Sequence, residues 1–500
     1  MKINLIFVLL LFAISTLTAQ RSFDDYNQSK KDEFDKFVDK QNKKFEHFTA
    51  RQNAEFADFL EREWLLFNSF GSILSPYTKP KLEEAPLAPC STNCDWSLDF
   101  KEEIEFVIRK MEKLNNKPNS NDIVVSDGSN IDVDFYGEVL HFAISGNLFQ
   151  KAIGISERNV ADYLRSISKF FAESSVLWDS IEAKSAEFGL NDWGKYLMVK
   201  SISDKIFERD DDKVLFCFYM LRNMGGYKVK IGRSVDNENL VLLIAIDNSK
   251  NVYTFGYYNF NEQGKDVKYY LVKGKSSGGI YSYDLNNQDL ILSQMRLDFD
   301  KTLSIGKCDC LRELKVNRLN LMIDLPFNSK NIAFLDEVPL TIFPIYFVSA
   351  MPEESQYVLN KVFGRLGSTY SPVDAVNILL NFVQTAFDYQ SDDDQFGREK
   401  YFYPEEVIAY PYSDCEDRSA LFGWLVSQYL NMSVIGLKYP GHLATAVYLG
   451  QDVEVKGATY FNYAGKRYYV CDPTYIAATI GMEMPQFKDV TPSVVKLKEL

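Results

Sequence analysis

The order of helix and strand signals near the C-terminus constrains the fold of this 500-residue chain more than any other feature. Ser413, followed three residues later by Glu416, forms the pattern of a capping box, so a helix is expected to begin there. Apolar, strand-like runs follow at residues 434–439, 443–449 and 467–471. The C-terminal unit is therefore expected to combine a helix with several strands.

Cys415 falls in the first turn of this expected helix. Unpaired backbone N–H groups and the helix dipole stabilise a thiolate at such a position. The neighbouring carboxylates of Asp414, Glu416 and Asp417 act in the opposite direction, because like charges disfavour the thiolate. A cationic partner is therefore needed if Cys415 is to act as a nucleophile.

Histidine is the natural partner, and the chain contains three. His47 belongs to a segment of repeated aromatic residues and His141 lies far upstream, whereas His442 follows a Pro-Gly turn and opens a strand. Asp472 closes the third strand-like run, where it could accept a hydrogen bond from the histidine ring. We therefore expect Cys415, His442 and Asp472 to act as catalytic nucleophile, base and orienter.

Three sequence blocks carry a resemblance to a known family. The blocks D-C-E-D-R-S-A-L-F, Y-P-G-H-L-A-T-A-V and R-Y-Y-V-C-D-P-T-Y resemble the Cys, His and Asp motifs of the transglutaminase-like superfamily. The match covers about residues 355–480, a quarter of the chain. It implies a papain-like fold, in which a helix carrying Cys415 packs on an antiparallel sheet carrying His442 and Asp472. The family includes cross-linking enzymes, peptidases, amidases and inactive binding proteins, and the motifs do not distinguish among the active ones.

Two further assignments concern the surroundings of these residues. The backbone N–H of Cys415 is expected to be one oxyanion donor, and a polar or aromatic side chain between Tyr389 and Tyr412 is the candidate for the other. Cys471 is expected to be a core residue, because it should point to the opposite face of its strand from Asp472.

An internal comparison indicates a degenerate copy of this unit upstream. Three upstream segments align with the three motif blocks: residues 211–220, 239–244 and 268–273. The catalytic positions would be occupied by Arg209, Asn239 and Lys273, separated by 30 and 34 residues against 27 and 30 in the C-terminal unit. Such a copy would be a binding or packing module. The alternative is that two α+β segments share generic apolar runs and Tyr-Tyr pairs.

The chain is too long for one ordinary domain, and we divide it where its patterns change. Trp178 and Trp193 are expected core residues of the helical region. The expected segments are a signal peptide (1–19), an aromatic-striped helix with an 11-residue repeat (20–70), a linker (71–99), a helical region plus degenerate transglutaminase-like domain (100–275), a β-rich connector (276–353) and a catalytic transglutaminase-like domain (354–500).

The N-terminal segments predict export and association. Lys2, the apolar run 5–14 and the small residues before Ala19 have the pattern of a secretory signal, and no second hydrophobic span follows. The mature protein is expected to be soluble in the periplasm, at the cell surface or outside the cell. The aromatic stripe of residues 20–70 should be covered by later domains or by a second copy. Membrane-surface binding is the alternative, although the polar face has no basic excess.

Composition narrows the classes of partner. A formal charge of -14 argues against a nucleic-acid partner. Cys90 and Cys94 could form disulfides with Cys308 and Cys310; a metal site made from the same four cysteines is the rival, which their spacing disfavours. No metal or organic cofactor is expected.

These inferences predict an exported thiol enzyme that acts on peptide or carboxamide bonds of a peptide or protein substrate. Hydrolysis is favoured over cross-linking, because nothing in the sequence marks a site for a lysine acceptor. The alternative is a non-enzymatic envelope scaffold or binding protein that uses papain-like domains for its interactions.

Overall fold

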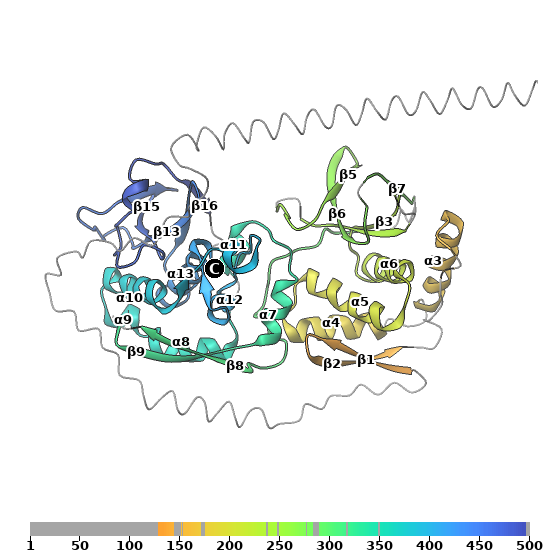
Figure 1. Ribbon diagram of the computed structural model, residues 1–500, viewed down its shortest axis with the longest axis horizontal. Helices are drawn as coiled ribbons and strands as arrows, with labels where there is room; N and C mark the ends of the chain where they lie inside the picture. Colours follow the sequence, from red (N-terminus) through yellow and green to blue (C-terminus); the bar gives the residue numbers. More distant parts are fainter. Residues whose placement is uncertain are drawn as a thin grey trace, which may run out of the picture. The chain divides into compact units, whose positions relative to one another are not determined.

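A computed structural model describes residues 129–496, apart from the internal stretches 145–151, 153, 172–175, 237–238, 248–249, 277, 284–289, 317–318 and 349–350. This part of the chain is an α+β protein in which helices accompany two five-stranded antiparallel sheets (Figure 1). The predicted signal peptide, aromatic repeat and linker lie outside the described residues. Within the described part, no helix has both the length and the apolar composition that crossing a bilayer requires.

The first described elements are a hairpin and three helices. They are β1 (Ser129–Phe135), β2 (Glu138–Ile144), α3 (Glu157–Phe171), α4 (Val176–Phe188) and α5 (Asp192–Ile206). Trp178 of α4 and Trp193 of α5 are both buried in the main apolar core, as predicted. The Trp193 indole donates a hydrogen bond to the carbonyl oxygen of Glu337 at 2.9 Å, so α5 is tied to a segment far along the chain.

One helix and a five-stranded sheet follow, here called the upstream unit. It comprises α6 (Asp210–Tyr219), a π-helical turn (Met220–Met224), β3 (Val229–Ser234), β4 (Leu240–Ala245), β5 (Tyr257–Glu262), β6 (Lys265–Lys273) and β7 (Ile280–Ser282). The strands lie in the order β5-β6-β4-β3-β7, and all pairs are antiparallel. Every residue of β4 is buried, so the middle of this sheet is covered on both faces.

The predicted β-rich connector is only partly β-structure. Its first strand, β7, belongs to the upstream sheet, and the remainder holds one hairpin and two helical segments. These are β8 (Cys310–Val316), β9 (Leu321–Phe327), α7 (Ser329–Asp336) and a 3₁₀ helix (Phe343–Val348). Asn328 explains the start of α7, because its side chain accepts hydrogen bonds from the backbone N–H groups of Lys330 and Asn331.

The C-terminal unit contains helices and the second five-stranded sheet. Its helices are α8 (Glu353–Phe363), α9 (Leu366–Thr369), α10 (Pro372–Ala386), α11 (Asp392–Phe396), α12 (Pro404–Ala409) and α13 (Cys415–Leu430). Its strands are β10 (Asp388–Tyr389), β11 (Tyr412–Ser413), β12 (Val434–Tyr439), β13 (His442–Tyr448), β14 (Tyr460–Tyr463), β15 (Lys466–Cys471) and β16 (Ser493–Lys496). The large sheet has the order β14-β15-β13-β12-β16, again antiparallel throughout.

Helix α13 is the central element of the C-terminal unit, and it packs against α10, β13 and the 3₁₀ helix. Residues Ala420 to Val426 are all buried, so the helix lies within the core rather than on its surface. At Gly423 the 3₁₀ helix comes so close that a Cβ atom would lie 2.7 Å from the Phe347 ring. Glycine is therefore required at this contact.

The two sheets share strand order, and they share register around their Tyr-Tyr pairs, although a shift between Leu242 and Leu243 interrupts the register of the upstream sheet. Tyr269 and Tyr270 of β6 pair with β4 as Tyr468 and Tyr469 of β15 pair with β13. Each outer hairpin turns through two residues with positive φ: Gln263-Gly264 (53° and 81°) and Ala464-Gly465 (49° and 77°). Both turns thus have the geometry that matches the twist of paired strands.

Candidate active site

Cys415 is the first residue of α13, as predicted, but the capping box differs from the expected one. The N-cap is Asp414, whose side chain accepts a hydrogen bond from the Glu416 N–H at 3.2 Å, and Asp417 accepts the Asp414 N–H at 3.0 Å. The prediction that Ser413 and Glu416 form the box is wrong by one residue. Ser413 lies in β11, and its hydroxyl accepts a hydrogen bond from Nε of Arg418.

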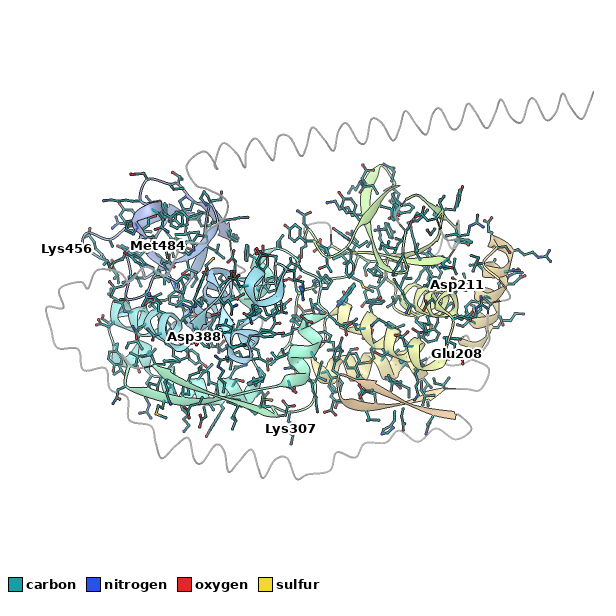
Figure 2. All side chains as sticks on the ribbon, in the orientation of Figure 1. Glu208, Asp211, Lys307, Asp388, Lys456 and Met484 are labelled. Carbon is teal, nitrogen blue, oxygen red and sulfur yellow. The ribbon has the colours of Figure 1, made fainter. Side chains whose placement is uncertain are left out.

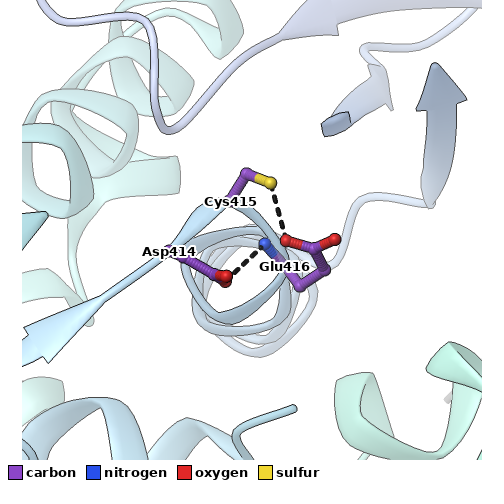
Figure 3. Close-up of side chains that lie close together, drawn as sticks. All are labelled: Asp414, Cys415 and Glu416. Carbon is purple, nitrogen blue, oxygen red and sulfur yellow. Dashed lines mark hydrogen bonds between the residues drawn. The ribbon is translucent and has the colours of Figure 1, made fainter. Parts of the chain in front are cut away.

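The thiol of Cys415 is buried and hydrogen-bonded to a carboxylate. It is 1% exposed, and its Sγ donates a hydrogen bond to the carboxylate of Glu416 at 2.6 Å (Figure 3). Burial, followed by the charges of Glu416 and Asp414, raises the pKa of Cys415 well above its usual value, although a hydrogen bond from the backbone of Leu443 acts against this rise. Among the described residues, the sulfur bonds with Glu416 and the backbone of Leu443 and not with a cationic side chain.

His442 and Asp472 form a buried pair. The Nε2 atom of His442 lies 2.8 Å from Oδ2 of Asp472, and both side chains are almost completely buried. The other oxygen of Asp472 accepts the backbone N–H groups of Thr474 and Tyr475 at 2.9 and 3.2 Å. Since the Asp472 carboxylate acts as an acceptor in these contacts, Nε2 of His442 must donate to it. We therefore assign the tautomer with the proton on Nε2 and the lone pair on Nδ1. The ring of Phe487 stacks on that of His442 with centroids 5.1 Å apart.

Side-chain hydrogen bonds hold the three site elements together. The Ser419 hydroxyl of α13 donates to the carbonyl of Leu443 in β13 at 3.1 Å. Thr445 of β13 donates to the carbonyl of Cys471 in β15 at 2.6 Å. Gln384 of α10 donates to the Asp472 carbonyl at 3.1 Å. Each bond joins a different pair of segments, and together they fix the positions of α13, β13 and the segment that carries Asp472.

The predicted nucleophile and base are brought to neighbouring positions without being hydrogen-bonded to each other. In the described part of the chain, the Cys415 sulfur bonds with Glu416 and Leu443, and the His442 ring with Asp472. The contact with Leu443 puts the start of β13 against the sulfur. Among the described residues, the side-chain hydrogen bond of the thiol is the one to Glu416, so the expected approach of His442 to the sulfur stays a prediction.

The expected oxyanion donors are only partly visible. The backbone N–H of Cys415 occupies the first helical position, where the helix itself offers no acceptor. In the segment 389–412, Tyr389 is engaged by the guanidinium of Arg418, which lies 5.5 Å from its ring centroid. Arg418 is a residue that the sequence reading missed. It is buried, donates to the Phe387 carbonyl at 2.6 Å, and its Nη1 has no partner among the described residues.

Carboxylates near the thiol could in principle hold a cation. Asp414, Cys415 and Glu416 offer ligand atoms within 4.8 Å of one another, as do Asp392, Asp414 and Asp417. Both carboxylate oxygens of Asp417, however, accept hydrogen bonds from backbone N–H groups, those of Asp414 and of Phe402. The capping of α13 thus explains much of this acidic cluster without a metal ion.

The equivalent place in the upstream unit has different chemistry. Asp211 (labelled in Figure 2) accepts the backbone N–H of Leu240 at 2.9 Å, as the sulfur of Cys415 accepts that of Leu443. The pairing of Ile244 with Tyr270 corresponds to the pairing of Val447 with Tyr469. Asn239 precedes Ile244 by five residues, and His442 precedes Val447 by five, so Asn239 takes the position of His442.

The predicted equivalence of Arg209 with Cys415 stays a prediction. Arg209 is the N-cap of α6, as Asp414 is the N-cap of α13, so the helix boundaries alone would align Arg209 with Asp414. Helix equivalence also aligns two buried aspartates. Asp212 accepts the Ala152 N–H at 2.8 Å, and Asp417 accepts the Phe402 N–H at 2.9 Å.

The predicted cysteine assignments have different outcomes. Cys471 is fully buried in the apolar core, as expected. Cys308 and Cys310 have no disulfide partner among the described residues, and Cys308 bonds with Glu354 at 3.6 Å. Their predicted partners in the linker lie outside the described residues, so the pairing stays a prediction.

Comparison with protein-family models, with curated proteins and with solved structures found no match to this chain. The resemblance to the transglutaminase-like superfamily therefore rests on the three sequence blocks and on the arrangement of the residues within them.

Proposed function

We propose that this protein is an exported thiol enzyme of the transglutaminase-like type, with a papain-like C-terminal unit. The observation that carries the proposal is the buried His442–Asp472 pair. Nδ1 of His442 is left to accept a proton, and the strand that begins with His442 packs against the helix that begins with Cys415. A cysteine at a helix start, a histidine and an orienting carboxylate are the parts that thiol acyl transfer requires.

The proposed reaction is transfer of an acyl group from a peptide or carboxamide. His442 Nδ1 takes the proton of Cys415, and the sulfur attacks the carbonyl carbon. The resulting oxyanion is stabilised by the Cys415 N–H, and the imidazolium by Asp472. His442 then protonates the leaving amine as the C–N bond breaks, which leaves a thioester. Water, deprotonated by the same histidine, attacks the thioester and releases the acid and the free thiol.

Glu416 sets a condition on this mechanism. Its carboxylate accepts a hydrogen bond from the Cys415 thiol and, together with burial, raises the pKa of that thiol. Both effects oppose formation of the thiolate in the resting site. Glu416 is only half-buried, which leaves its side chain room to turn away from the sulfur when a substrate enters. We propose that this movement precedes proton transfer to His442.

One consideration separates hydrolysis from cross-linking as the outcome of the reaction. A cross-linking enzyme must admit a lysine amine to the thioester, and the residues offer no marked site for one. Hydrolysis of peptide or carboxamide bonds is therefore the proposed activity. Export through residues 1–19 remains part of the proposal, and sequencing the N-terminus of the mature protein recovered from the cell envelope or medium would check it.

The upstream unit is proposed to be a second, non-catalytic copy. Shared strand order, shared register and matching hairpin turns support a duplication. Lys273, the residue predicted at the aspartate position, forms an ion pair with Asp204 at 3.3 Å, and Asp204 also binds Lys213 at 3.1 Å. Groups engaged in this way leave no nucleophile or base, so the copy would serve packing or binding.

A non-enzymatic envelope scaffold or binding protein is the second candidate. It is favoured by one observation: the thiol is 1% exposed and hydrogen-bonded to a carboxylate, which are properties of an inert cysteine. In this case the two papain-like units would act only as interaction surfaces.

The test is to profile the purified full-length protein against peptide and glutamine-amide libraries, with Cys415→Ala and His442→Ala as matched variants. The proposal expects turnover in the wild type, loss of turnover in Cys415→Ala, and nearly complete loss in His442→Ala. Activity that survives Cys415→Ala would overturn the assignment of the nucleophile. A wild type with no turnover and no thioester trapped by hydroxylamine would favour the scaffold.

A further inference from the structure

A cavity of about 350 Å³ lies between the upstream residues and the C-terminal unit. Its size is at the lower end for ligand pockets, which span about 300–1,000 Å³, so it suits one side chain or a small molecule. Aromatic residues from both parts of the chain line it: Trp193, Tyr196, Phe255, Tyr346, Tyr401 and Tyr403. The indole of Trp193 and the ring of Phe255 have centroids 5.6 Å apart, and Tyr346 packs against Tyr403 at 4.6 Å.

The cavity adjoins the first turn of α13. The backbone N–H of Phe402 donates to Asp417 at 2.9 Å, which attaches this segment to the turn that carries Cys415. The residues on either side, Tyr401 and Tyr403, line the cavity. The charge of Glu416 is also among the causes that raise the pKa of Tyr401. The wall of the cavity is therefore directly attached to the residues that surround the thiol.

The charges on the cavity wall are paired with one another. Lys200 lies 3.5 Å from Glu337, while Arg398 and Lys400 lie 3.1 and 3.2 Å from Asp336. Because these charges already have partners, the cavity makes little demand for a charged ligand. Because the charges are paired and the walls are largely aromatic, a suitable occupant is neutral and aromatic.

We propose that this cavity binds an aromatic side chain of the peptide whose carbonyl is attacked by Cys415. The inference rests on the proposed thiol activity and adds its substrate preference. It also gives the upstream part of the chain a role, because Trp193, Tyr196 and Phe255 would select the substrate although that part holds no catalytic residue. An aromatic ring suits aromatic walls, since offset and edge-to-face contacts add to the burial of apolar area.

The experiment measures peptide binding without turnover. The full-length Cys415→Ala variant is titrated calorimetrically with acetyl-Gly-Tyr-Gly-amide and with acetyl-Gly-Ala-Gly-amide. Val272, which lines the cavity, is then changed to tryptophan to fill the space. The exposed Val235 receives the same substitution as a matched control. Phe255→Leu, which removes one aromatic wall and adds no bulk, replaces Val272→Trp if that variant does not unfold cooperatively.

We expect the tyrosine peptide to bind at least ten-fold more tightly than the alanine peptide. Val272→Trp or Phe255→Leu should remove this preference, and Val235→Trp should keep it. Equal affinity for the two peptides, or a preference that survives both cavity variants, would overturn the proposal. Binding of the tyrosine peptide together with a wild type that turns over nothing would retain the site and reject the enzyme. Turnover without aromatic preference would do the reverse.

Discussion

The thiol of Cys415 and the carboxylate of Glu416 share a hydrogen bond, and this contact controls the charge of the nucleophile. Because the pKa of Cys415 is raised, its thiolate fraction is small at neutral pH and grows only as the pH rises above the usual value for cysteine. Glu416→Gln removes the negative charge and should lower that pKa. We expect iodoacetamide to alkylate Cys415 about ten-fold faster at pH 7, the change that one pKa unit produces, with the whole rate profile moved to lower pH.

Peptide mass mapping would follow Cys415 separately from Cys217 and Cys471, which are also buried. Glu187→Gln, at an exposed position on α4, is the matched control and should leave the rate unchanged. A rate in Glu416→Gln that equals the wild-type rate would mean that accessibility, and not charge, limits the thiol.

Asp472 determines which nitrogen of His442 can accept a proton. In Asp472→Asn, the amide oxygen would stay on the N–H groups of Thr474 and Tyr475, so its NH₂ would face Nε2. That contact selects the opposite tautomer, with the proton on Nδ1. We expect kcat for a substrate found by profiling to fall by about a hundredfold to ten-thousandfold, with little change in KM. An unchanged kcat/KM would leave a Cys–His dyad and remove the orienting role of Asp472.

At the scale of elements, the segment that leads into α12 depends on a buried ion pair. Lys400 and Glu406 lie 2.7 Å apart and are almost completely buried, and the pair raises the pKa of Lys400 to about 12. Lys400→Met would leave the Glu406 carboxylate buried and uncompensated, at a cost of about 3–5 kcal/mol in free energy of unfolding. Urea denaturation of the full chain would measure this loss.

Two further variants test whether the uncompensated charge of Glu406 causes this loss of stability. Lys400→Met/Glu406→Gln should lose much less, because glutamine is neutral and can still accept the Tyr403 N–H as Glu406 does. Lys184→Met, in an exposed pair with Glu187, should cost less than about 1 kcal/mol. Equal losses at Lys400 and Lys184 would show that the buried pair is not important for stability.

At the scale of the whole molecule, the aromatic repeat of residues 20–70 remains a prediction, because it lies outside the described residues. Each phenyl ring removed from water stabilises the protein by roughly 1.5–3 kcal/mol, so the stripe should be covered by protein. Deleting residues 20–70 should convert an oligomer to a monomer or expose an apolar surface. Sedimentation and binding of a hydrophobic dye would detect either change. Identical mass, solubility and dye binding would instead favour membrane attachment.

The sequence alone determined much of the local structure of the candidate site. Cys415 at a helix start, His442 at the start of a strand and Asp472 after another strand were all predictable. Capping residues, the Pro-Gly turn and apolar runs are local signals, and each acts over only a few residues. The same locality explains the error of one residue in the capping box. Several polar residues near a helix start can each serve as the cap, and tertiary contacts decide which one does.

Only the tertiary structure decided which side chains meet. It placed Glu416 on the thiol, Arg418 on the Phe387 carbonyl, and Trp193 in a cavity with Tyr401, more than 200 residues away in the chain. It also revealed that the two sheets share one strand order, which short apolar patterns could only suggest. The physical reason is that rotamers and contacts between distant segments follow from the packing of the whole core. A hydrogen bond or cavity wall of this kind has no signature in the residues next to it.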